Sequence, residues 1–467
     1  MLLRLVYKVD FQLLPIFCAF YFLSSLERSS LDFSVISGLT ADLNITTTES
    51  QCFAAAFYFC VIIFDVPSNI IIRCWKPSFW LGIIMGVILS VWGIMSISMA
   101  ACTHFHGLVI ARLIISICEA GFFPSAVYYL SFWYTRREFG KRLGCLWSFR
   151  CLAGASGGLF AYGVSCITIT KHMHVWQWTF IIQGSPCVII ALIISWYLPN
   201  DVKTAKFLVV QEQNIIMQKL KDDVGILNYK DWSWDQFGTV LLDSKTYAFT
   251  LIYLLGAASV QGVTLFLPTA ISRFHFAKSS VLHTQLLMMP PYILAIFISM
   301  SVSYSSDRYY ERSYHLIGTN VVSMAALIVL LLPIPCIYTG YITTCILTAT
   351  VYAHVPIKVT WITNNLVFST GFTRRTVALG VIISLGSVGS AIGSQVFYDP
   401  PNYMKGKALI LVFLVLQSLM ILLTRYCFDR ENMRRKKLGM DDKAFQAYKY
   451  NGEDLAGDRH PDFRYTI

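Results

Sequence analysis

Four ionisable residues lie inside apolar stretches near the start of the chain, where a charge needs a partner. Arg112 and Glu119 belong to the apolar part of the stretch 111–142, and Glu27 and Arg28 are adjacent in an earlier apolar stretch. A charge at the centre of a bilayer costs at least about 2.5–3.5 kcal/mol, so such residues usually face a partner, a cavity or a pathway. Because Arg112 and Glu119 are seven residues apart, a helix places them on one face, about 10.5 Å apart along its axis. We therefore expect a compact cluster of two acids and two arginines.

Such a cluster has a chemical use in transport. An arginine in a cavity of low dielectric constant binds a carboxylate bidentately through its planar guanidinium group. A buried glutamate beside an arginine can titrate near neutral pH, because desolvation and the neighbouring cation shift its pKa in opposite directions. Together the two residue types can couple the entry of a proton to the entry of an anion. A structural network of salt bridges that only fixes helix packing is the alternative.

A second polar stripe lies in a later apolar stretch. His354, Lys358, Trp361 and Asn365 follow one another at helical spacing and share one face, and Asn364 is adjacent to the last of them. A lysine near the middle of a membrane helix either faces a cavity or extends its ammonium group to the interface. We predict that Lys358, Trp361, Asn364 and Asn365 bind substrate from the second half of the chain. A packed polar interface between helices explains the stripe equally well.

Further charges stand at the ends of apolar stretches. We interpret Asp307 and Arg308, together with Arg136 and Arg137 in the basic segment after residue 133, as contacts that gate the pathway. Arg150 lies about two turns into the next apolar stretch, and we expect its side chain to extend to the interface. No nucleotide-binding loop, nucleophile constellation or metal-ligand spacing of cysteine and histidine is present in the sequence. We therefore expect no enzymatic activity, no metal and no cofactor, with the proton as the coupling ion.

The elements that position these residues are membrane helices. The 467-residue chain is 56% hydrophobic and only 13% charged, whereas soluble domains carry about 25% charged residues. The net charge of +11 fits short loops that orient membrane helices better than a nucleic-acid partner. Apolar windows long enough to span a bilayer predict an all-α membrane protein with twelve transmembrane helices. The windows are 13–38, 51–72, 79–101, 107–133, 144–168, 177–198, 246–268, 284–304, 315–335, 341–365, 376–398 and 407–428.

The windows divide into two groups of six. We predict an N-terminal half over 1–198, a cytoplasmic linker over 199–245, a C-terminal half over 246–428 and a cytoplasmic tail over 429–467. The linker contains an amphipathic stretch, 205–220, which predicts a helix near the membrane surface; a plain solvated linker is the alternative. Lysine and arginine are more frequent in the short loops on the side of the termini, which predicts that both termini are cytoplasmic. The sequon at Asn44 falls in the first outside loop and is a candidate glycosylation site.

The two groups share an internal repeat. YTRR at 134–137 and FTRR at 372–375 stand six predicted helices apart, and each precedes a glycine-rich helix. Glycines at such spacing allow membrane helices to approach closely. Two pseudo-symmetric six-helix halves in parallel are the build of major facilitator transporters. Chance similarity between two short basic loops is the alternative.

Several motifs resemble the allantoate permease family of fungal transporters, in the anion:cation symporter branch of the major facilitator superfamily. They are EAGFFPSAVYYLSFWYTRRE at 119–138, DVPSNIIIR at 65–73, FLPT at 266–269 and the closing HPDFRYTI at 460–467. The resemblance runs almost from end to end. It implies transport of a small organic anion such as nicotinate, pantothenate, biotin or allantoate, commonly together with protons.

The resemblance also suggests roles for the charge cluster. A bacterial galactonate transporter of the wider branch has an acid–arginine pair and an Arg-x6-Glu pattern that map onto Glu27-Arg28 and Arg112 with Glu119. By that resemblance Glu27 and Glu119 carry protons, while Arg28 and Arg112 handle substrate and gating. The family usually has Leu-Asp-Arg-x-Asn where this chain has LERSS at 26–30, and Gly-Asn where it has GS at 386–387. These departures leave proton coupling intact and bear on substrate identity.

These observations predict a proton-coupled carrier of a small carboxylate that works by alternating access. A membrane nutrient sensor with a transporter fold and no significant flux is the alternative. We expect a monomer in the bilayer without a nucleic-acid partner. The plasma membrane is the predicted location because the resembling family mostly imports nutrients, with the endoplasmic reticulum as the alternative.

Overall fold

A computed structural model describes most of the chain and contains helices as its regular elements in that part. The described residues are 2–34, 85–120, 122–131, 133–167, 173–197, 207–224, 240–273, 281–332, 336–366, 372–397, 403–437 and 464–467, with short pieces within 39–68 and at 202, 205 and 238. The helices before residue 200 are α1 (Leu2–Ser34), α4 (Met85–Met99), α5 (Phe105–Glu119), α6 (Phe122–Leu130), α7 (Arg136–Ile167) and α8 (Val175–Tyr197). The later ones are α9 (Val210–Val224), α11 (Ser244–Arg273), α12 (Val281–Tyr309), α13 (Ser313–Leu331), α14 (Ile337–Leu366), α15 (Phe372–Ser394) and α16 (Met404–Lys437).

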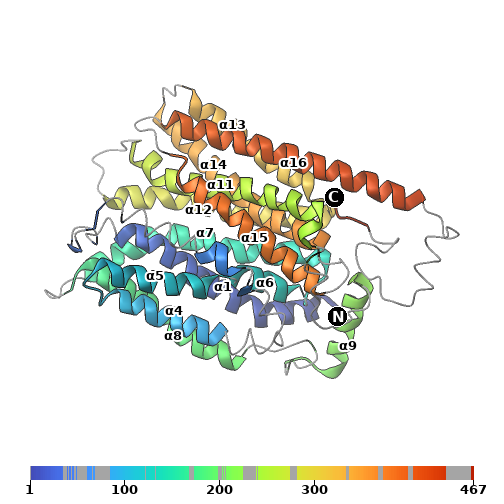
Figure 1. Cartoon of the computed structure of the whole chain (residues 1–467), viewed down its shortest axis with the longest axis horizontal. Coiled ribbons are helices and arrows are strands. Elements are labelled where there is room, and N and C mark those ends of the chain that lie inside the picture. Colours follow the sequence, from blue (N-terminus) through green and yellow to red (C-terminus); the bar gives the residue numbers. More distant parts are fainter. Residues whose placement is uncertain are drawn as a thin grey trace.

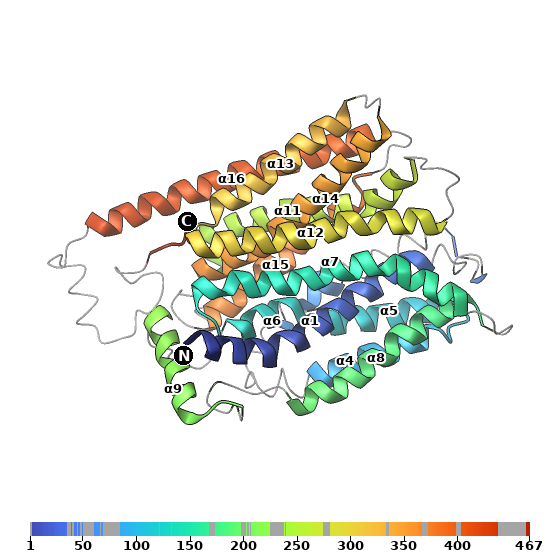
Figure 2. The same cartoon turned by 180° about the vertical axis from the view of Figure 1, so that it is seen from behind.

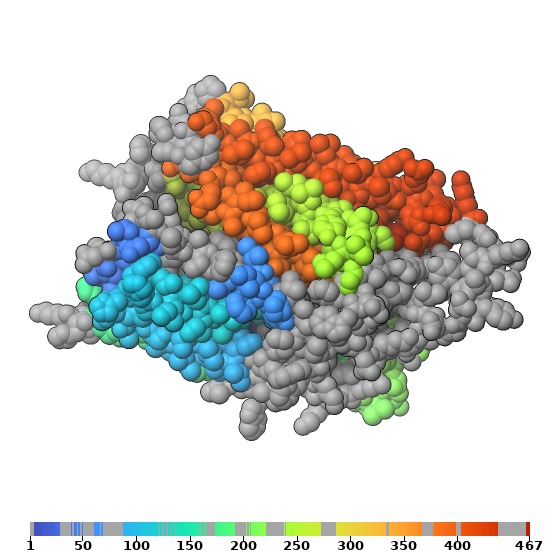
Figure 3. Space-filling model, in the orientation of Figure 1, coloured from blue at the N-terminus to red at the C-terminus, as the bar shows by residue number. Residues whose placement is uncertain are grey.

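The helices form two groups that lie side by side. Helices α1 to α8, the N-terminal half, occupy one side of the molecule, and α11 to α16, the C-terminal half, occupy the other (Figures 1 and 2). Figure 3 shows the same division on the surface, with blue to cyan residues opposite yellow-green to red ones. Among the described helices, α1 and α11 to α16 are long and apolar enough to cross a membrane. The predicted count of twelve spans stays a prediction, since most of the second window lies outside the described residues.

Helices α7 and α12 join the two halves along their length (Figure 2). Glycines of α7 make this approach possible. A methyl group at Gly144 would come within 2.8 Å of Ser303 Oγ, and one at Gly154 would come within 2.8 Å of the Tyr292 ring. Small residues at a helix interface bring backbones together where the lipid supplies no hydrophobic drive for association.

Within the C-terminal half, α15 packs on α11 through two glycines four residues apart. A methyl group at Gly389 would overlap the backbone carbonyl of Leu254, and one at Gly393 would overlap that of Ala258. Because these obstacles are backbone atoms, no side-chain rotation relieves the overlap. The close approach expected from the glycine-rich sequence is present in the structure.

Substitution of Gly389 by alanine is therefore expected to destabilise the folded protein by about 1–3 kcal/mol, the usual effect of an overpacked interior. Thermal unfolding of purified protein in detergent would measure the change as a lower melting temperature. Gly318→Ala is the matched control, because a methyl group at Gly318 in α13 meets no atom within 4 Å. Equal melting temperatures for the two variants would show that α15 does not approach α11 as described.

The fourth predicted span is not one helix. Helix α5 ends at Glu119, and Ala120 leaves the helical conformation with φ −58° and ψ 134°. A new helix, α6, then starts at Phe122. Pro124 lies in the first turn of α6, where its missing N–H group costs no helical hydrogen bond. The continuous helix expected over 107–133 is thus wrong, and the break places Glu119 at a helix end.

Both chain termini and α9 lie at one end of the bundle, which we call the terminal face (Figure 1). Helix α9 confirms a helix over 210–220 of the predicted amphipathic stretch 205–220, whereas the described residues before Val210 are not helical. Two ion pairs fasten it to the N-terminal half, Lys8 to Glu212 at 2.7 Å and Lys219 to Glu138 at 2.6 Å. The hydrogen bond from Lys8, followed by one from the Val209 amide, lowers the pKa of Glu212. The carboxylate is therefore charged at neutral pH.

Candidate functional site

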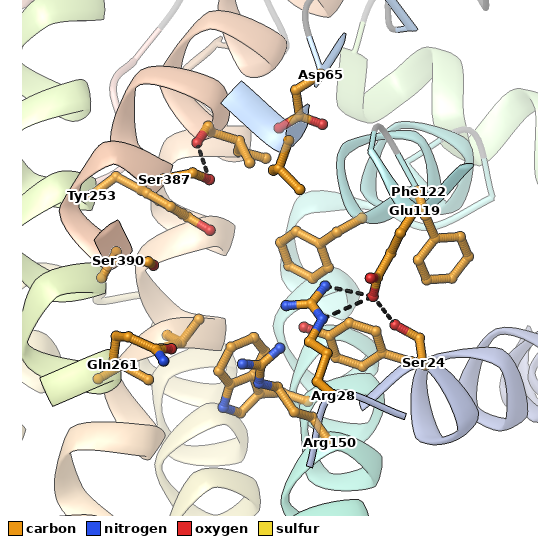
Figure 4. Close-up of a pocket in the computed structure, with 18 of the residues that line it drawn as sticks. Ser24, Arg28, Asp65, Glu119, Phe122, Arg150, Tyr253, Gln261, Ser387 and Ser390 are labelled. Carbon is orange, nitrogen blue, oxygen red and sulfur yellow. Dashed lines mark hydrogen bonds and ion pairs between the residues drawn. The ribbon is translucent and has the colours of Figure 1, made fainter. Parts of the chain in front are cut away.

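A cavity between the two halves is the candidate substrate site. It encloses about 890 Å³, counting the space at its mouth. Three cationic and two acidic side chains share its wall with several aromatic rings (Figure 4). The N-terminal half contributes Tyr21, Ser24, Arg28, Val61, Asp65, Glu119, Ala120, Phe122, Phe123, Trp147 and Arg150, and the C-terminal half contributes Tyr253, Ala257, Val260, Gln261, Val355, Lys358, Ile383, Ser387 and Ser390.

Glu119 and Arg28 form an ion pair on the cavity wall (Figure 4). Arg28 donates from Nε at 2.9 Å and from Nη2 at 2.6 Å, and both bonds reach Glu119 Oε1. The Ser24 hydroxyl donates to the same oxygen. The other oxygen, Oε2, is buried and has no hydrogen-bond partner among the described residues. One oxygen therefore accepts all the hydrogen bonds that Glu119 makes to Arg28 and Ser24.

Arg112 and Glu27 form a second ion pair behind the first. Arg112 Nη1 donates to Glu27 Oε1 at 2.8 Å, and the side chains are only 6% and 1% exposed. Neither residue is among those that line the cavity. The structure thus brings the four predicted charges together but pairs each arginine with the acid of the other helix. Of the two acids predicted to carry protons, Glu119 lines the cavity.

Arg150 also lines the cavity, contrary to the expectation that its side chain extends to the interface. Its guanidinium carbon lies 5.1 Å from the centre of the Trp147 ring, three residues earlier in α7. Guanidinium groups stack favourably on tryptophan faces. Figure 4 shows Arg150 beside Arg28, with Gln261 on the opposite wall. The sequence analysis did not predict Gln261, because a single amide within an apolar helix does not by itself indicate a site.

Lys358 is the cation that the C-terminal half contributes. Its side chain is 1% exposed, and its Nζ lies 4.5 Å from the centre of the Tyr253 ring in α11. Among the described residues no carboxylate pairs with it, in contrast to Arg28 on the facing wall. Lys358 therefore lines the cavity, and its predicted role in substrate binding stays a prediction.

Comparison with known proteins bears on this architecture. The family model described as Major Facilitator Superfamily matches residues 17–394, most of the chain. The chain belongs to this superfamily. Its fold and its family both identify the protein as a multi-pass membrane transporter. The proteins that match it are transporters rather than enzymes.

Its relatives include an uncharacterised transporter of Schizosaccharomyces pombe, 30% identical over 93% of this chain and 88% of that protein. The high-affinity nicotinic acid transporter of Saccharomyces cerevisiae is 24% identical over 99% of this chain and 84% of its own length. Among solved structures, the fucose:proton symporter of E. coli matches 88% of this chain and 98% of its own, with a TM-score of 0.62 at 13% identity. That likeness shows the fold alone.

The polar stripe of the facilitator's helix α14 divides between two places. Lys358 lines the cavity, whereas Trp361 and Asn365, nearer the helix end, donate hydrogen bonds to the backbone carbonyl of Thr466 at 2.9 Å and 3.0 Å. Asn364 is buried and is also absent from the cavity wall. We therefore do not carry Trp361, Asn364 or Asn365 into the candidate substrate site.

The predicted gating residues lie at the terminal face, where α12 meets the start of α7. Asp307 accepts a hydrogen bond from the Lys141 backbone amide at 2.6 Å, which connects the halves. Its ion-pair partner is Arg312 at 2.6 Å rather than the neighbouring Arg308, whose side chain is exposed. A methyl group at Gly140 would collide with the Asp307 carboxylate, so a larger residue there would displace this contact.

Arg137 contributes to the same contact between halves. Its guanidinium carbon lies 5.3 Å from the centre of the Tyr310 ring, which follows α12. The Arg136 side chain and Asn44 both lie outside the described part of the facilitator, so their predicted roles stay predictions. In the described residues, no group of three histidine, cysteine, aspartate or glutamate side chains could hold a metal ion.

Proposed function

We propose that the protein is a secondary active transporter that moves a small carboxylate-bearing anion together with a proton. The observation that carries the proposal is Lys358, a buried lysine in the cavity wall without a carboxylate partner among the described residues. An isolated buried charge is strongly unfavourable unless something pairs with it. A substrate carboxylate in the cavity supplies that partner, and Arg28 and Arg150 face it from the other half.

Glu119 is the proposed proton carrier. Protonation of its carboxylate weakens the bond to Arg28, because a neutral acid attracts a guanidinium group far less than a carboxylate does. Arg28 then becomes available to the substrate anion. Proton and anion thus favour each other's binding through one shared arginine. The buried pair of Glu27 and Arg112 lies behind this site and holds α1 against α5.

The proposed substrate class is that of the allantoate permease family, which the sequence motifs resemble. Aromatic rings on both walls, among them Phe123, Trp147 and Tyr253, suit a flat ring that carries a carboxylate. The relative that is a nicotinic acid transporter supports nicotinate as the first compound to try. We further propose that twelve helices span the plasma membrane, that the terminal face is cytoplasmic and that the transporter is a monomer.

Uptake by cells that lack their own carriers tests the proposal. Labelled nicotinate, pantothenate, biotin and allantoate would be offered at mildly acidic and at neutral pH. We expect one compound to enter faster at acidic pH, and we expect Glu119→Gln to abolish that acid stimulation. Glu212→Gln is the matched control, since Glu212 lies on α9 outside the cavity. Absence of uptake by protein shown to be at the cell surface would favour the sensor instead.

A further inference from the structure

Residues 464–467 bind at the terminal face, in a site formed by side chains of α11, α14 and α16. Tyr465 is buried, and its ring stacks on Phe428 with 4.5 Å between centres and an angle of 9°. Lys245 and Arg435 place their cationic groups 4.7 Å and 5.0 Å from the centre of the same ring. The aromatic side chain is thus enclosed between one ring and two cations.

The site also binds the backbone of the segment. Asn365 accepts from the Thr466 amide at 2.9 Å and donates to the Thr466 carbonyl at 3.0 Å, and Trp361 donates to that carbonyl at 2.9 Å. Asn432 accepts a hydrogen bond from the Tyr465 backbone amide at 2.8 Å and donates one to the Tyr465 backbone carbonyl at 2.9 Å. Two asparagine side chains therefore each hold both polar groups of one residue, which is how one strand pairs with another in a sheet. Such pairing is specific for an extended peptide.

The bound segment also touches a residue that takes part in the contact between the two halves. The backbone amide of Arg312 donates to the Ile467 backbone oxygen at 2.8 Å. The guanidinium group of Arg312 pairs with Asp307, which in turn holds the Lys141 amide of the N-terminal half. One residue, Arg312, thus contacts the segment through its backbone and the inter-half contact through its side chain.

A second route connects the same two features. The Thr466 hydroxyl donates to the Tyr310 hydroxyl at 3.4 Å, and Arg137 of the N-terminal half lies over the Tyr310 ring. Tyr310 has a positive φ of 55°, a conformation that non-glycine residues adopt only when their surroundings hold them there. The segment is one of those surroundings.

We propose that residues 464–467 are an intramolecular ligand whose binding braces the two halves against each other at the terminal face. The proposal rests on alternating access as the mode of action of the proposed transporter and not on the identity of its substrate. In alternating access the halves separate at each face in turn. Opening of the terminal face breaks the contacts of Asp307 and Arg137 across the halves, and the segment opposes that step. Its release makes opening easier.

Hydrogen exchange of the purified full-length protein, followed by mass spectrometry without substrate, tests the brace. In Tyr465→Ala we expect amides at the start of α7, residues 136–142, to exchange about 10-fold faster, because the lost contacts raise the population of the open face. Exchange in the α5 peptide 105–119 should not change. Tyr426→Ala is the matched control, since Tyr426 in α16 is 63% exposed.

Adding the peptide HPDFRYTI, residues 460–467, in excess should restore slow exchange to Tyr465→Ala, and the same peptide with alanine at Tyr465 should not. Thr466→Pro, which removes the amide that donates to Asn365, provides a second variant should the first fail to fold. Faster exchange at the ends of α14 and α16 with no change at 136–142 would overturn the brace. Unchanged exchange everywhere would overturn the binding of the segment itself. Because no substrate is added, either result stands whatever the uptake experiment shows.

Discussion

Replacement of Arg112 by methionine is expected to destabilise the folded protein by about 3–5 kcal/mol, the effect of breaking a buried ion pair by removing one partner. The variant leaves the Glu27 carboxylate, 1% exposed, without the guanidinium group that now lies 2.8 Å away. Thermal or denaturant unfolding of protein purified in detergent measures the loss. We also expect the loss of stability to reduce the yield of folded protein in the membrane sharply.

The double variant Arg112→Met with Glu27→Gln is the control that isolates the charge. It removes both charges while it keeps both side chains at similar volume, and buried pairs replaced in this way are often neutral or even stabilising. We therefore expect the double variant to recover most of the lost stability. If the double variant is as unstable as the single one, packing and not the lost ion pair explains the effect.

The second large effect concerns substrate binding. Lys358→Met is expected to lower the uptake efficiency for the anion identified in the panel by about 10- to 100-fold, as a lost hydrogen bond to a charged group is worth about 1.5–3 kcal/mol. Methionine keeps an unbranched, flexible side chain of similar shape and lacks the ammonium group. Initial uptake rates over a range of substrate concentrations measure the change, normalised to the amount of protein at the cell surface.

A comparison of substrates sharpens this test. The wild-type protein should discriminate strongly between a carboxylate and its neutral amide, and Lys358→Met should lose much of that discrimination. Lys405→Met is the matched control, because Lys405 is an exposed lysine of α16 that does not line the cavity. Uptake by Lys358→Met within about twofold of wild type, less than a single neutral hydrogen bond would change it, would remove Lys358 from the substrate site.

Some of the site follows from the sequence because of the energetics of the membrane. Charges at Glu27, Arg28, Arg112 and Glu119 are so costly in an apolar helix that they had to meet, and the structure brings them together. Which arginine meets which acid could not be predicted, because spacing along one helix says nothing of the rotation and height of its neighbour. The close contacts of the α15 glycines with α11 were also predictable, because small residues allow membrane helices to approach each other closely.

The polar stripe on α14 shows a limit of this reasoning. Lys358 and Asn365 share a helix face, as predicted, but they stand about 10 Å apart along the axis. At one height the face meets the cavity, and at the other it meets the Thr466 backbone. The occupant of that second place comes from a segment about 100 residues later in the chain, and no local pattern announces such a contact.

The break after Glu119 had a readable signal that the hydropathy windows obscured. The motif AGFFP at 120–124 contains a glycine and a proline within five residues, which is typical of a helix boundary. A hydropathy window depends only on amino-acid composition, so it does not detect a glycine or a proline that ends a helix. Arg150 was misjudged for a related reason, because only the placement of α7 at the junction of the halves turns that side chain into the cavity.

Helix α14 is almost entirely surrounded by protein, and its residues have a bearing on how the chain enters the bilayer during synthesis. The apolar 18-residue window of α14 has a mean hydropathy of 1.3, against 2.3 for that of α16, and His354 and Lys358 lie in the second half of α14. Each such residue opposes transfer from the insertion machinery into lipid. Helix α14 therefore depends on α12 and α13, against which it packs and which are made before it, to be accepted into the membrane. Variants that disturb this packing are expected to fail at biogenesis, before any question of transport arises.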